Sequence, residues 1–393
     1  MPKVSQNMAE AVQRSLEYIF LDNYYADDVV KKTLQSNPKW GSRDRKFIAK
    51  SIYDIVRYKR YYQYLSGKDI FNTETIRLCT EIYWKLNAPF LEIELPIEGE
   101  VINQRIEEAS QVLKIRESIP DWLDSKGESY FSDAWSKEIH SMNEEANVYI
   151  RVNTLKCTSE KLQQQLLKEN IETEFISPLT LQVKQRSVLT NTVAFKEGWF
   201  EIQDIGSQKI GEALGVRNNS FIIDACAGAG GKTLQLAALT NNKADILSMD
   251  VEKKKLEELN KRAIRAGAHR VKTLLIDAST LIKYKEKADF LLLDVPCSGL
   301  GVLRRKPDDK WKLSPEKIES LKSIQHKILH EYTGMLKKGG TVVYATCSIF
   351  ADENSNQVQL FIQNNPNYTL EKEELILPSQ GGDGFYWARL KKN

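Results

Sequence analysis

The sequence of 393 residues has few cysteines, and their spacing argues against two common uses of this residue. The five cysteines are an odd number, lie far apart in the chain and form no Cys-x-x-Cys pair. A disulfide framework and a structural zinc site both need grouped thiols, so we expect neither. The histidines offer no alternative, because His326 and His330 lie one helical turn apart without a third ligand. We therefore expect no bound metal.

The sequence also lacks a strong net charge and a long apolar run. The formal net charge is only +3, so a nucleic-acid partner has to be sought in local patches. The first residues contain no apolar stretch of the kind found in signal peptides, and no window approaches the roughly 18 apolar residues of a membrane helix. We expect a cytoplasmic, monomeric protein without a membrane partner.

The composition is that of a globular protein with several domains. With 41% hydrophobic and 28% charged residues the chain is not of the disordered class, and its length allows two or three domains. We expect a helical domain over residues 1–140, a small α/β module over residues 141–204 and a larger α/β domain over residues 205–393.

The helical domain carries a basic helix face. Between Ile48 and Val56 the apolar residues recur at helical spacing, which predicts one buried face. The other face is either solvated, or it grips an RNA backbone with its cations and stacks tyrosine rings on bases. The residues that such a surface would use are Lys39, Arg43, Arg45, Lys46, Lys50, Arg57, Lys59, Arg60, Tyr61, Tyr62 and Tyr64. Residues 88–108, with two prolines and several glutamates, are expected to form a loop or linker.

After this domain, short strands give way to a regular alternation of strands and helices. Residues 148–152 and 180–183 alternate like half-buried strands, and residues 159–169 are amphipathic with Ser159 as the expected N-cap. From about residue 207 the alternation predicts a doubly wound parallel sheet. We expect strands at residues 221–225, 246–249, 271–276, 290–293 and 341–345, helices at residues 233–239, 252–266 and 315–336, and a closing strand pair in the tail.

Two of the predicted strands are followed by a cysteine. Residues 290–293 are apolar, as in a strand buried on both faces, and they precede Asp294 and Cys297. Residues 341–345 are mostly β-branched or apolar, and Cys347 follows them. Because ligands bind at the carboxyl ends of such strands, both thiols are candidates for chemistry at the edge of the sheet.

A glycine-rich loop at residues 224–233 follows the first strand of this sheet and opens a helix. Its ending, Gly-Lys-Thr, is that of a phosphate loop, but this motif needs a glycine at the position of Cys226. The next three strands end on Asp250, Asp277 and Asp294. Each acid alone would be a helix cap or a solvated residue, but an acid after the second strand is well placed to bind ribose hydroxyls. Together these features predict an adenosine cofactor without phosphates.

Three motifs, in order, resemble those of the Sun/Nop family of RNA cytosine-5 methyltransferases. They are Asp-Ala-Cys-Ala-Gly-Ala-Gly-Gly-Lys-Thr at 224–233, Asp-Val-Pro-Cys-Ser-Gly-Leu-Gly at 294–301, and Ala-Thr-Cys-Ser-Ile at 345–349. Similar stretches of the family are matched by Arg151-Val-Asn-Thr, Gln203-Asp204 and Asp383-Gly384-Phe385. The resemblance extends from about residue 145 to the end. More loosely, the helical N-terminus resembles the NusB-like domain of the bacterial ribosomal RNA members of type B.

The resemblance implies a Rossmann-like methyltransferase domain that uses S-adenosylmethionine and acts on RNA. It places the cofactor against Cys226, Ala227, Gly228, Ala229, Gly230, Gly231 and Lys232, with Asp250 on the ribose, Asp277 near the adenine and Asp294 near the methionine or the target base. The family has Ala-Pro where this chain has Gly228-Ala229, so we expect a more flexible loop that still binds the cofactor. The basic residues after the second motif are expected to contact the RNA backbone. They are Arg304, Arg305 and Lys306.

Two thiols suit the reaction that this family performs. Carbon 5 of cytosine is a poor nucleophile, and a thiolate added to carbon 6 turns the ring into an enamine-like species that accepts a methyl group. A second thiol can then assist release, and Asp294 can hold or protonate the polar edge of the ring. The sequence does not order the two thiols, whereas the resemblance assigns attack to Cys347 and release to Cys297. The other three cysteines are interpreted as small hydrophobes.

The leading hypothesis is therefore methylation of carbon 5 of a cytosine in structured RNA, most simply small-subunit (16S) ribosomal RNA. The target base would have to be unstacked or presented in a single strand. One alternative is a transfer RNA methyltransferase with the same chemistry. Another is a non-catalytic RNA-binding assembly factor, which would not need two thiols. A nucleotide hydrolase would bind a triphosphate and is disfavoured by Cys226.

Overall fold

The computed structural model describes residues 5–89 and 91–393, and its internal contacts divide the chain into two compact units. One unit contains Met1–Glu144 and Leu303–Pro315, and the other contains Glu145–Val302 and Glu316–Asn393. Residues 1–4, which belong to the stretch that argued against a signal peptide, lie outside the described part. Within that part, no helix has both the length and the apolar content needed to cross a membrane. The predicted division into three domains stays a prediction.

The first unit is helical. Its helices are α1 (Gln6–Phe20), α2 (Ala26–Ser36), α3 (Ser42–Arg57), α4 (Lys59–Ser66), α5 (Thr73–Asn87), α6 (Gly99–Gln111), α7 (Leu113–Arg116), α8 (Asp121–Phe131), α9 (Trp135–Asn143) and α16 (Asp309–Lys312). In α3 the side chains of Ile48, Ile52, Ile55 and Val56 are buried, which confirms the predicted apolar face. They pack with residues of α1, α2 and α5 in one core.

The prediction of a loop over residues 88–108 is wrong from residue 99 onward. Helix α6 begins at Gly99 and buries Ile102 and Ala109. The last proline of the stretch, Pro96, precedes the helix and so does not interrupt it. Burial of two apolar side chains on one face therefore outweighs the local glutamate-rich, glycine-containing composition.

Only some of the cations predicted to form a basic surface on α3 and on the turn after it are exposed. Arg57 is buried, and its guanidinium donates to the carbonyl oxygens of Leu303 and Arg304. The guanidinium of Arg45 donates to the carbonyl oxygens of Leu34 and Trp40. The proposed RNA contact is therefore wrong for Arg57, because a buried guanidinium with carbonyl partners cannot reach a phosphate. Exposed cations of this set are Lys39, Arg43, Lys46 and Lys50.

The second unit begins with a small antiparallel sheet in the strand order β2-β3-β1-β4. Its elements are β1 (Val148–Val152), α10 (Ser159–Lys168), β2 (Thr173–Ser177), β3 (Thr180–Val183), α11 (Val193–Lys196) and β4 (Phe200–Ile202). The predicted helix is present, but its N-cap is Thr158, whose hydroxyl accepts from the N–H of Lys161 at 3.3 Å. The hydroxyl of Ser159 instead donates to the carbonyl oxygen of Pro178.

The larger sheet has seven strands in the order β10-β11-β9-β8-β5-β6-β7. They are β5 (Phe221–Asp224), β6 (Asp245–Asp250), β7 (Val271–Leu275), β8 (Ala288–Asp294), β9 (Leu336–Thr346), β10 (Tyr368–Ile376) and β11 (Phe385–Lys392). β5 to β9 are parallel, whereas β11 pairs antiparallel with β9 and with β10. This confirms the doubly wound sheet and the closing strand pair, and it makes β8 and β9 neighbours.

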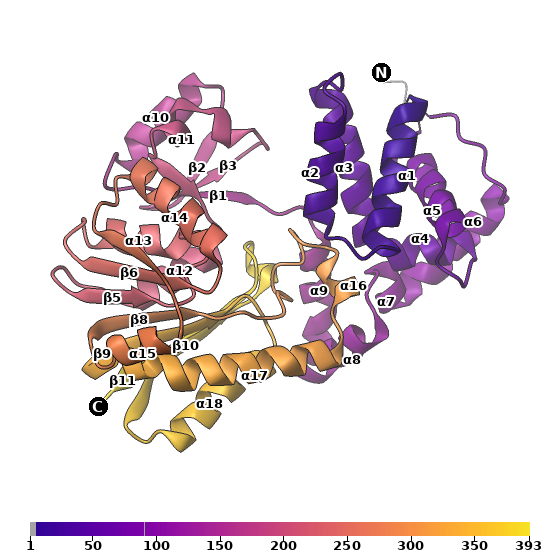
Figure 1. Cartoon of the computed structure of the whole chain (residues 1–393). Coiled ribbons are helices and arrows are strands. Elements are labelled where there is room, and N and C mark those ends of the chain that lie inside the picture. Colours follow the sequence, from indigo (N-terminus) through magenta and orange to yellow (C-terminus); the bar gives the residue numbers. More distant parts are fainter. Residues whose placement is uncertain (1–4, 90) are drawn as a thin grey trace. The chain divides into compact units, whose positions relative to one another are not determined.

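Helices cover both faces of this sheet (Figure 1). One face carries α12 (Ile205–Ala213), α13 (Gly231–Leu239) and α14 (Lys253–Ala266), and the other carries α15 (Ala278–Lys283), α17 (Pro315–Tyr332) and α18 (Ser355–Asn364). In β8, Phe290 and Leu292 pack in one layer while Leu291 and Leu293 pack in the other. The strand is thus buried on both faces, as its apolar run predicted.

Candidate active site

Parallel pairing of β8 with β9 brings the two predicted thiols together. Asp294 is the register partner of Ala345, and the chain runs on from these residues to Cys297 and Cys347. The Sγ atoms of the two cysteines lie 3.1 Å apart, and the backbone N–H of Cys347 donates to Sγ of Cys297 at 3.2 Å. Both thiols are free and half-buried. The site therefore joins two residues that are far apart in the sequence.

The two sulfurs are not equivalent. The hydrogen bond to Cys347 and burial raise the pKa of Cys297 well above its ordinary value, and the negative charges of Cys347 and Glu353 raise it further. The Cys297 thiol therefore resists ionisation, and the contact between the two sulfurs allows either atom as the donor. Burial also raises the pKa of Cys79 to about 12 and that of Cys157 to about 11. The buried thiol of Cys79 and the half-buried thiol of Cys157 thus behave as the expected hydrophobes.

The tail of the chain closes against the cysteine loops. The backbone N–H of Gly301 donates to the carbonyl oxygen of Cys347 at 2.9 Å, and the N–H of Gly384 donates to the carbonyl oxygen of Gly301 at 2.7 Å. A Cβ on Gly301 would lie 2.2 Å from the carbonyl oxygen of Gly384, so only glycine fits at position 301. The Asp-Gly-Phe stretch at residues 383–385 thus fixes the backbone beside Cys347.

The glycine-rich loop follows β5 and has the backbone geometry of a ligand-binding turn. Gly230 has φ +88°, and a Cβ on it would lie 2.5 Å from Cγ of Leu259, so glycine is required on both counts. Gly228 has φ +53° and has no heavy atom within 4 Å of the position of a Cβ. The loop is therefore open to solvent beside Gly228, which leaves room for a ligand against the backbone.

The loop is held from outside by two arginines. The guanidinium of Arg151 donates to the carbonyl oxygen of Gly231 at 2.9 Å, and that of Arg262 donates to the carbonyl oxygen of Ala229 at 2.8 Å. Within the loop, Cys226 packs against a core layer of the sheet, and burial raises its pKa well above the ordinary value. A thiol held protonated in this way behaves as a small apolar group and not as a nucleophile.

Asp250, at the end of β6, lies against the glycine loop. One carboxylate oxygen accepts the N–H of Gly228 at 2.8 Å, and the other accepts the N–H of Glu252 at 2.9 Å. Each oxygen of a carboxylate has a second lone pair, so acceptors remain for hydroxyl groups of a sugar. The open backbone at Gly228 and these acceptors fit the adenosyl part of S-adenosylmethionine.

Asp277 does what a single acid at a helix start usually does. Its side chain caps α15 by accepting the N–H of Thr280 at 2.8 Å, and it also accepts the hydroxyl of Ser279 at 2.7 Å. The hydrogen bond from Ser279 and the other capping bonds lower the pKa of this carboxyl. The predicted contact with adenine stays a prediction.

Lys232, expected to contact a cofactor or a phosphate, forms an ion pair inside the site. Its Nζ lies 2.6 Å from Oδ2 of Asp294, and the side chains are 11% and 30% exposed. The ammonium thus orients the Asp294 carboxylate at the end of β8. Nearby, burial raises the pKa of Asp224 to about 7, and the Thr233 hydroxyl donates to it at 2.6 Å.

The expected RNA contact of the basic stretch after Gly301 is wrong for Arg304. This side chain is buried in the helical unit, where it donates to the carbonyl oxygen of Ser141 and lies 3.5 Å from Oε2 of Glu144. A desolvated guanidinium with these partners is a structural anchor. Lys306, in contrast, is exposed.

Glu353 and Asn354 were not predicted as site residues. Both are fully buried, and both contact the cysteine loops. They lie in the stretch Ala-Asp-Glu-Asn, which has the composition of a solvated turn. One sequence gives no signal that distinguishes a buried acid in such a stretch from an exposed one.

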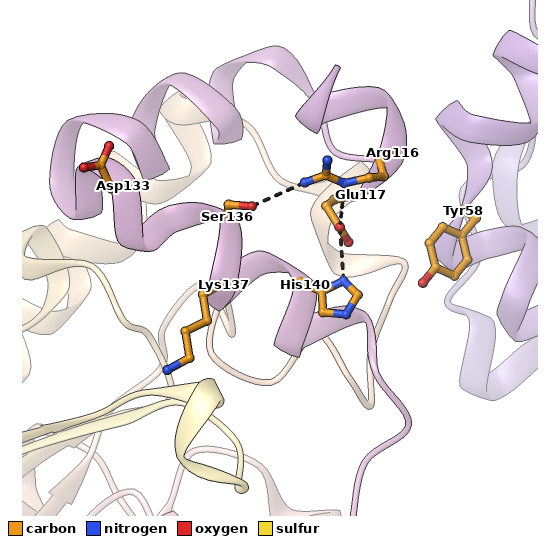
Figure 2. A pocket seen from close by; sticks show the side chains of 7 residues that line it. All are labelled: Tyr58, Arg116, Glu117, Asp133, Ser136, Lys137 and His140. Carbon is orange, nitrogen blue, oxygen red and sulfur yellow. Dashed lines mark hydrogen bonds and ion pairs between the residues drawn. The ribbon is translucent and has the colours of Figure 1, made fainter. Parts of the chain in front are cut away.

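A separate hollow of about 580 Å³ lies in the helical unit (Figure 2). Arg116, one of the cations that line it, is bonded within the unit, to Glu117 at 3.2 Å and to Ser136 at 3.3 Å. None of the lining residues belongs to the predicted site, so we assign the chemistry to the strand ends instead. The hollow is lined by Tyr58, Arg116, Glu117, Asp133, Ser136, Lys137 and His140.

Two families and several relatives match this chain. The family described as 16S rRNA methyltransferase RsmB/F matches residues 212–391, and the RsmF/B-like ferredoxin-like domain matches residues 119–188. Ribosomal RNA small subunit methyltransferase B of Proteus mirabilis (strain HI4320) is 33% identical over 282 residues, which cover 70% of this chain and 65% of that protein. The chain thus spans slightly less than two thirds of that relative. The probable ribosomal RNA small subunit methyltransferase B of Bacillus subtilis (strain 168) is 33% identical over 319 residues, which cover 75% of this chain and 71% of that protein.

Solved structures share the fold. The crystal structure of PH0851 matches with a TM-score of 0.81 and 22% identity, covering 100% of both chains. The crystal structure of NSun6 from Pyrococcus horikoshii with SFG matches with a TM-score of 0.65 and 23% identity, covering 70% of this chain and 98% of that chain. At these identities the likeness concerns the fold alone, and it confirms the expected Rossmann-like α/β class.

Proposed function

The chain belongs to the RsmB/F family of 16S rRNA methyltransferases, and we propose that it methylates carbon 5 of a cytosine in small-subunit (16S) ribosomal RNA. The cofactor of this methyltransferase family is S-adenosylmethionine, as expected from the sequence. The observation that carries the cytosine-5 chemistry is the 3.1 Å approach of the Cys297 and Cys347 sulfurs at the ends of neighbouring strands. An RNA-binding factor without catalysis would have no use for this pair.

Cys347 is the nucleophile in this proposal. The family resemblance gives this order, and the raised pKa of Cys297 supports it, because a thiol that resists ionisation is a poor nucleophile. The thiolate adds to carbon 6 of the cytosine, and carbon 5 becomes nucleophilic. Asp294, oriented by Lys232, holds the polar edge of the ring. S-adenosylmethionine, when bound at the glycine-rich loop and Asp250, supplies the methyl group.

Cys297 completes the reaction. Its sulfur lies 3.1 Å from that of Cys347 in the structure, so it is close to the base once the Cys347 sulfur is bonded to carbon 6. Cys297 then loses its proton to water and takes up the proton of carbon 5. The Cys347–carbon bond breaks, which restores the aromatic ring and frees the thiolate. One proton leaves the base for each methyl group that enters, so the step is balanced.

Labelled methyl transfer tests the substrate and the position together. Purified protein with labelled S-adenosylmethionine should label small-subunit ribosomal RNA, either free or in its particle, and bisulfite sequencing should locate the product at a cytosine. Transfer RNA offered under the same conditions distinguishes the alternative substrate. Cys347→Ala is the matched inactive control. Label confined to transfer RNA, or located away from carbon 5, would contradict the proposal.

The same proposal includes a cytoplasmic, monomeric enzyme that needs no metal. Among the described residues, no group of three or more His, Cys, Asp or Glu side chains is placed to hold a metal ion. Gel filtration combined with light scattering tests the monomer, and activity after dialysis against a chelator tests the metal. A dimeric mass, or activity that is restored only by a divalent cation, would contradict these two parts.

A further inference from the structure

Two consecutive buried residues, Glu353 and Asn354, contact different loops of the site. They follow β9 at the end of a short 3-10 helix, Ala351–Glu353, and their exposed fractions are 0% and 1%. The carboxylate of Glu353 faces the loop of Cys297, and the amide of Asn354 faces the loop of Cys347. One turn of chain thus reaches both cysteines.

Glu353 holds the loop before and after Cys297. One carboxylate oxygen accepts the backbone N–H of Ser298 at 2.8 Å and the amide of Gln325 at 2.9 Å. The other oxygen accepts the hydroxyl of Ser298 at 2.5 Å. The same Gln325 amide donates to the carbonyl oxygen of Pro296 at 3.0 Å. The residues on either side of Cys297 are therefore tied, directly or through Gln325, to one buried carboxylate.

Asn354 does the same for Cys347. Its Oδ1 accepts the hydroxyl of Thr346 at 2.5 Å, and its Nδ2 donates to the carbonyl oxygen of Ser348 at 2.9 Å. The Thr346 hydroxyl in turn accepts the N–H of Ser348 at 3.2 Å. Both neighbours of Cys347 are thus fixed by one amide.

We propose that Glu353 and Asn354 are positioning residues, each for one of the two cysteines. Glu353 sets the place of Cys297, which releases the product, and Asn354 sets the place of Cys347, which attacks the base. Neither side chain touches the Cys347 and Cys297 sulfurs through a hydrogen bond, so both act through the neighbouring backbone and hydroxyls. The assignment of attack and release to the two cysteines rests on the proposed function, whereas the positioning of each cysteine loop by Glu353 or Asn354 does not depend on it.

Because the Glu353 carboxylate is buried, it depends on the hydrogen bonds that it accepts from the Cys297 loop and from α17. A buried carboxylate is costly unless donors satisfy it, and here three hydrogen bonds do so. Its donors belong to the loop of Cys297 and to α17, so these hydrogen bonds persist only while that loop keeps its position. Because catalysis depends on placement within about 1 Å, a loosened loop would slow one step of the reaction strongly.

The two residues predict opposite kinetic defects. Glu353→Ala should accumulate a covalent protein–RNA adduct, as Cys297→Ala should, since attack proceeds and release fails. Asn354→Ala should form neither adduct nor product at the normal rate, with a loss of about 100-fold. Glu353→Gln should restore turnover, because its amide oxygen accepts from Ser298 and Gln325 while its NH₂ donates to the Ser298 hydroxyl. Denaturing gels and single-turnover methylation measure these outcomes.

A second measurement tests the positions without RNA. Alkylation by N-ethylmaleimide, followed by peptide mass spectrometry, should become faster at Cys297 in Glu353→Ala and faster at Cys347 in Asn354→Ala. The buried thiol of Cys79 serves as the folding control and should stay unmodified in both variants. If either substitution changes both cysteines equally, or neither, the proposed division is wrong. If alkylation follows the proposal while Cys297→Ala gives no adduct, the cytosine-5 mechanism fails and the positioning assignment stands.

Discussion

Sγ of Cys297 lies 3.1 Å from Sγ of Cys347, although 50 positions separate the two residues in the chain. The contact exists because β8 and β9 are parallel neighbours that end at the same edge of the sheet. The hydrogen bond to Cys347 and burial raise the pKa of Cys297 well above its ordinary value, which supports the proposed attack by Cys347. Two of the predictions below depend on this relationship.

Removal of one thiol should stop the reaction at a defined stage. Cys297→Ala should accumulate a protein–RNA adduct that survives denaturation, since Cys347 can attack but release is blocked. Cys347→Ala should give neither adduct nor methylated product. Denaturing electrophoresis with labelled RNA measures both, and Cys157→Ala, a half-buried thiol of the small sheet region, is the control. The reverse pattern would exchange the two roles.

Oxidation should link the pair. A disulfide needs about 2.05 Å between the sulfurs, so a shift of about 1 Å closes the observed gap. Hydrogen peroxide should convert both thiols to a disulfide, with the two hydrogens and two electrons passing to peroxide to give water. Non-reducing peptide mapping should detect the Cys297–Cys347 linkage, and methylation should be lost until a dithiol reductant is added. Loss of activity without this linkage would contradict the prediction.

Loss of the acid at the end of β6 should weaken cofactor binding. Asp250→Ala removes the acceptors for ribose hydroxyls and also the bond to the N–H of Gly228. We expect the dissociation constant of S-adenosylmethionine to rise by about tenfold or more, as for the loss of hydrogen bonds to a charged group. Isothermal titration calorimetry measures it. Asp245→Ala, at the exposed start of the same strand, is the matched control, and an unchanged affinity of Asp250→Ala would remove the assignment.

The buried carboxyl of Asp224 should make stability depend on pH. Burial raises its pKa from 3.8 to about 7, so the folded chain holds a proton that the unfolded chain releases at lower pH. The stability contributed by the protonated group is present below the unfolded pKa and falls as the pH rises through about 7. Asp224→Asn stays neutral and should lose less stability between about pH 4 and about pH 8, by at most about 4 kcal/mol.

Urea unfolding of the wild type and Asp224→Asn across that interval measures the effect. Curves for the two proteins should diverge towards high pH, where only the wild type must ionise a buried group. Parallel pH dependence in both proteins would show that this carboxyl is not the source.

Local patterns in the sequence were enough to find most elements and most candidate residues. The apolar spacing from Ile48 to Val56 is a pattern within one helix, and the apolar run at residues 290–293 is a pattern within one strand. The predictions that were wrong concern features set by tertiary contacts. Residues 99–111 have a weak local helix signal, and α6 exists because Ile102 and Ala109 find a core to pack against. Burial of Arg57 and Arg304 is likewise decided by partners far along the chain.

The sequence by itself determined which chemical groups this protein has and at which strand ends they stand, because motif spacing and strand periodicity are local properties. It also determined the family, through three motifs in order. Only the tertiary structure decided that the two sulfurs lie 3.1 Å apart, that Arg57 and Arg304 are buried and that Glu353 and Asn354 each hold one cysteine loop. Distances and burial arise from contacts between residues distant in the chain, and no local pattern encodes them.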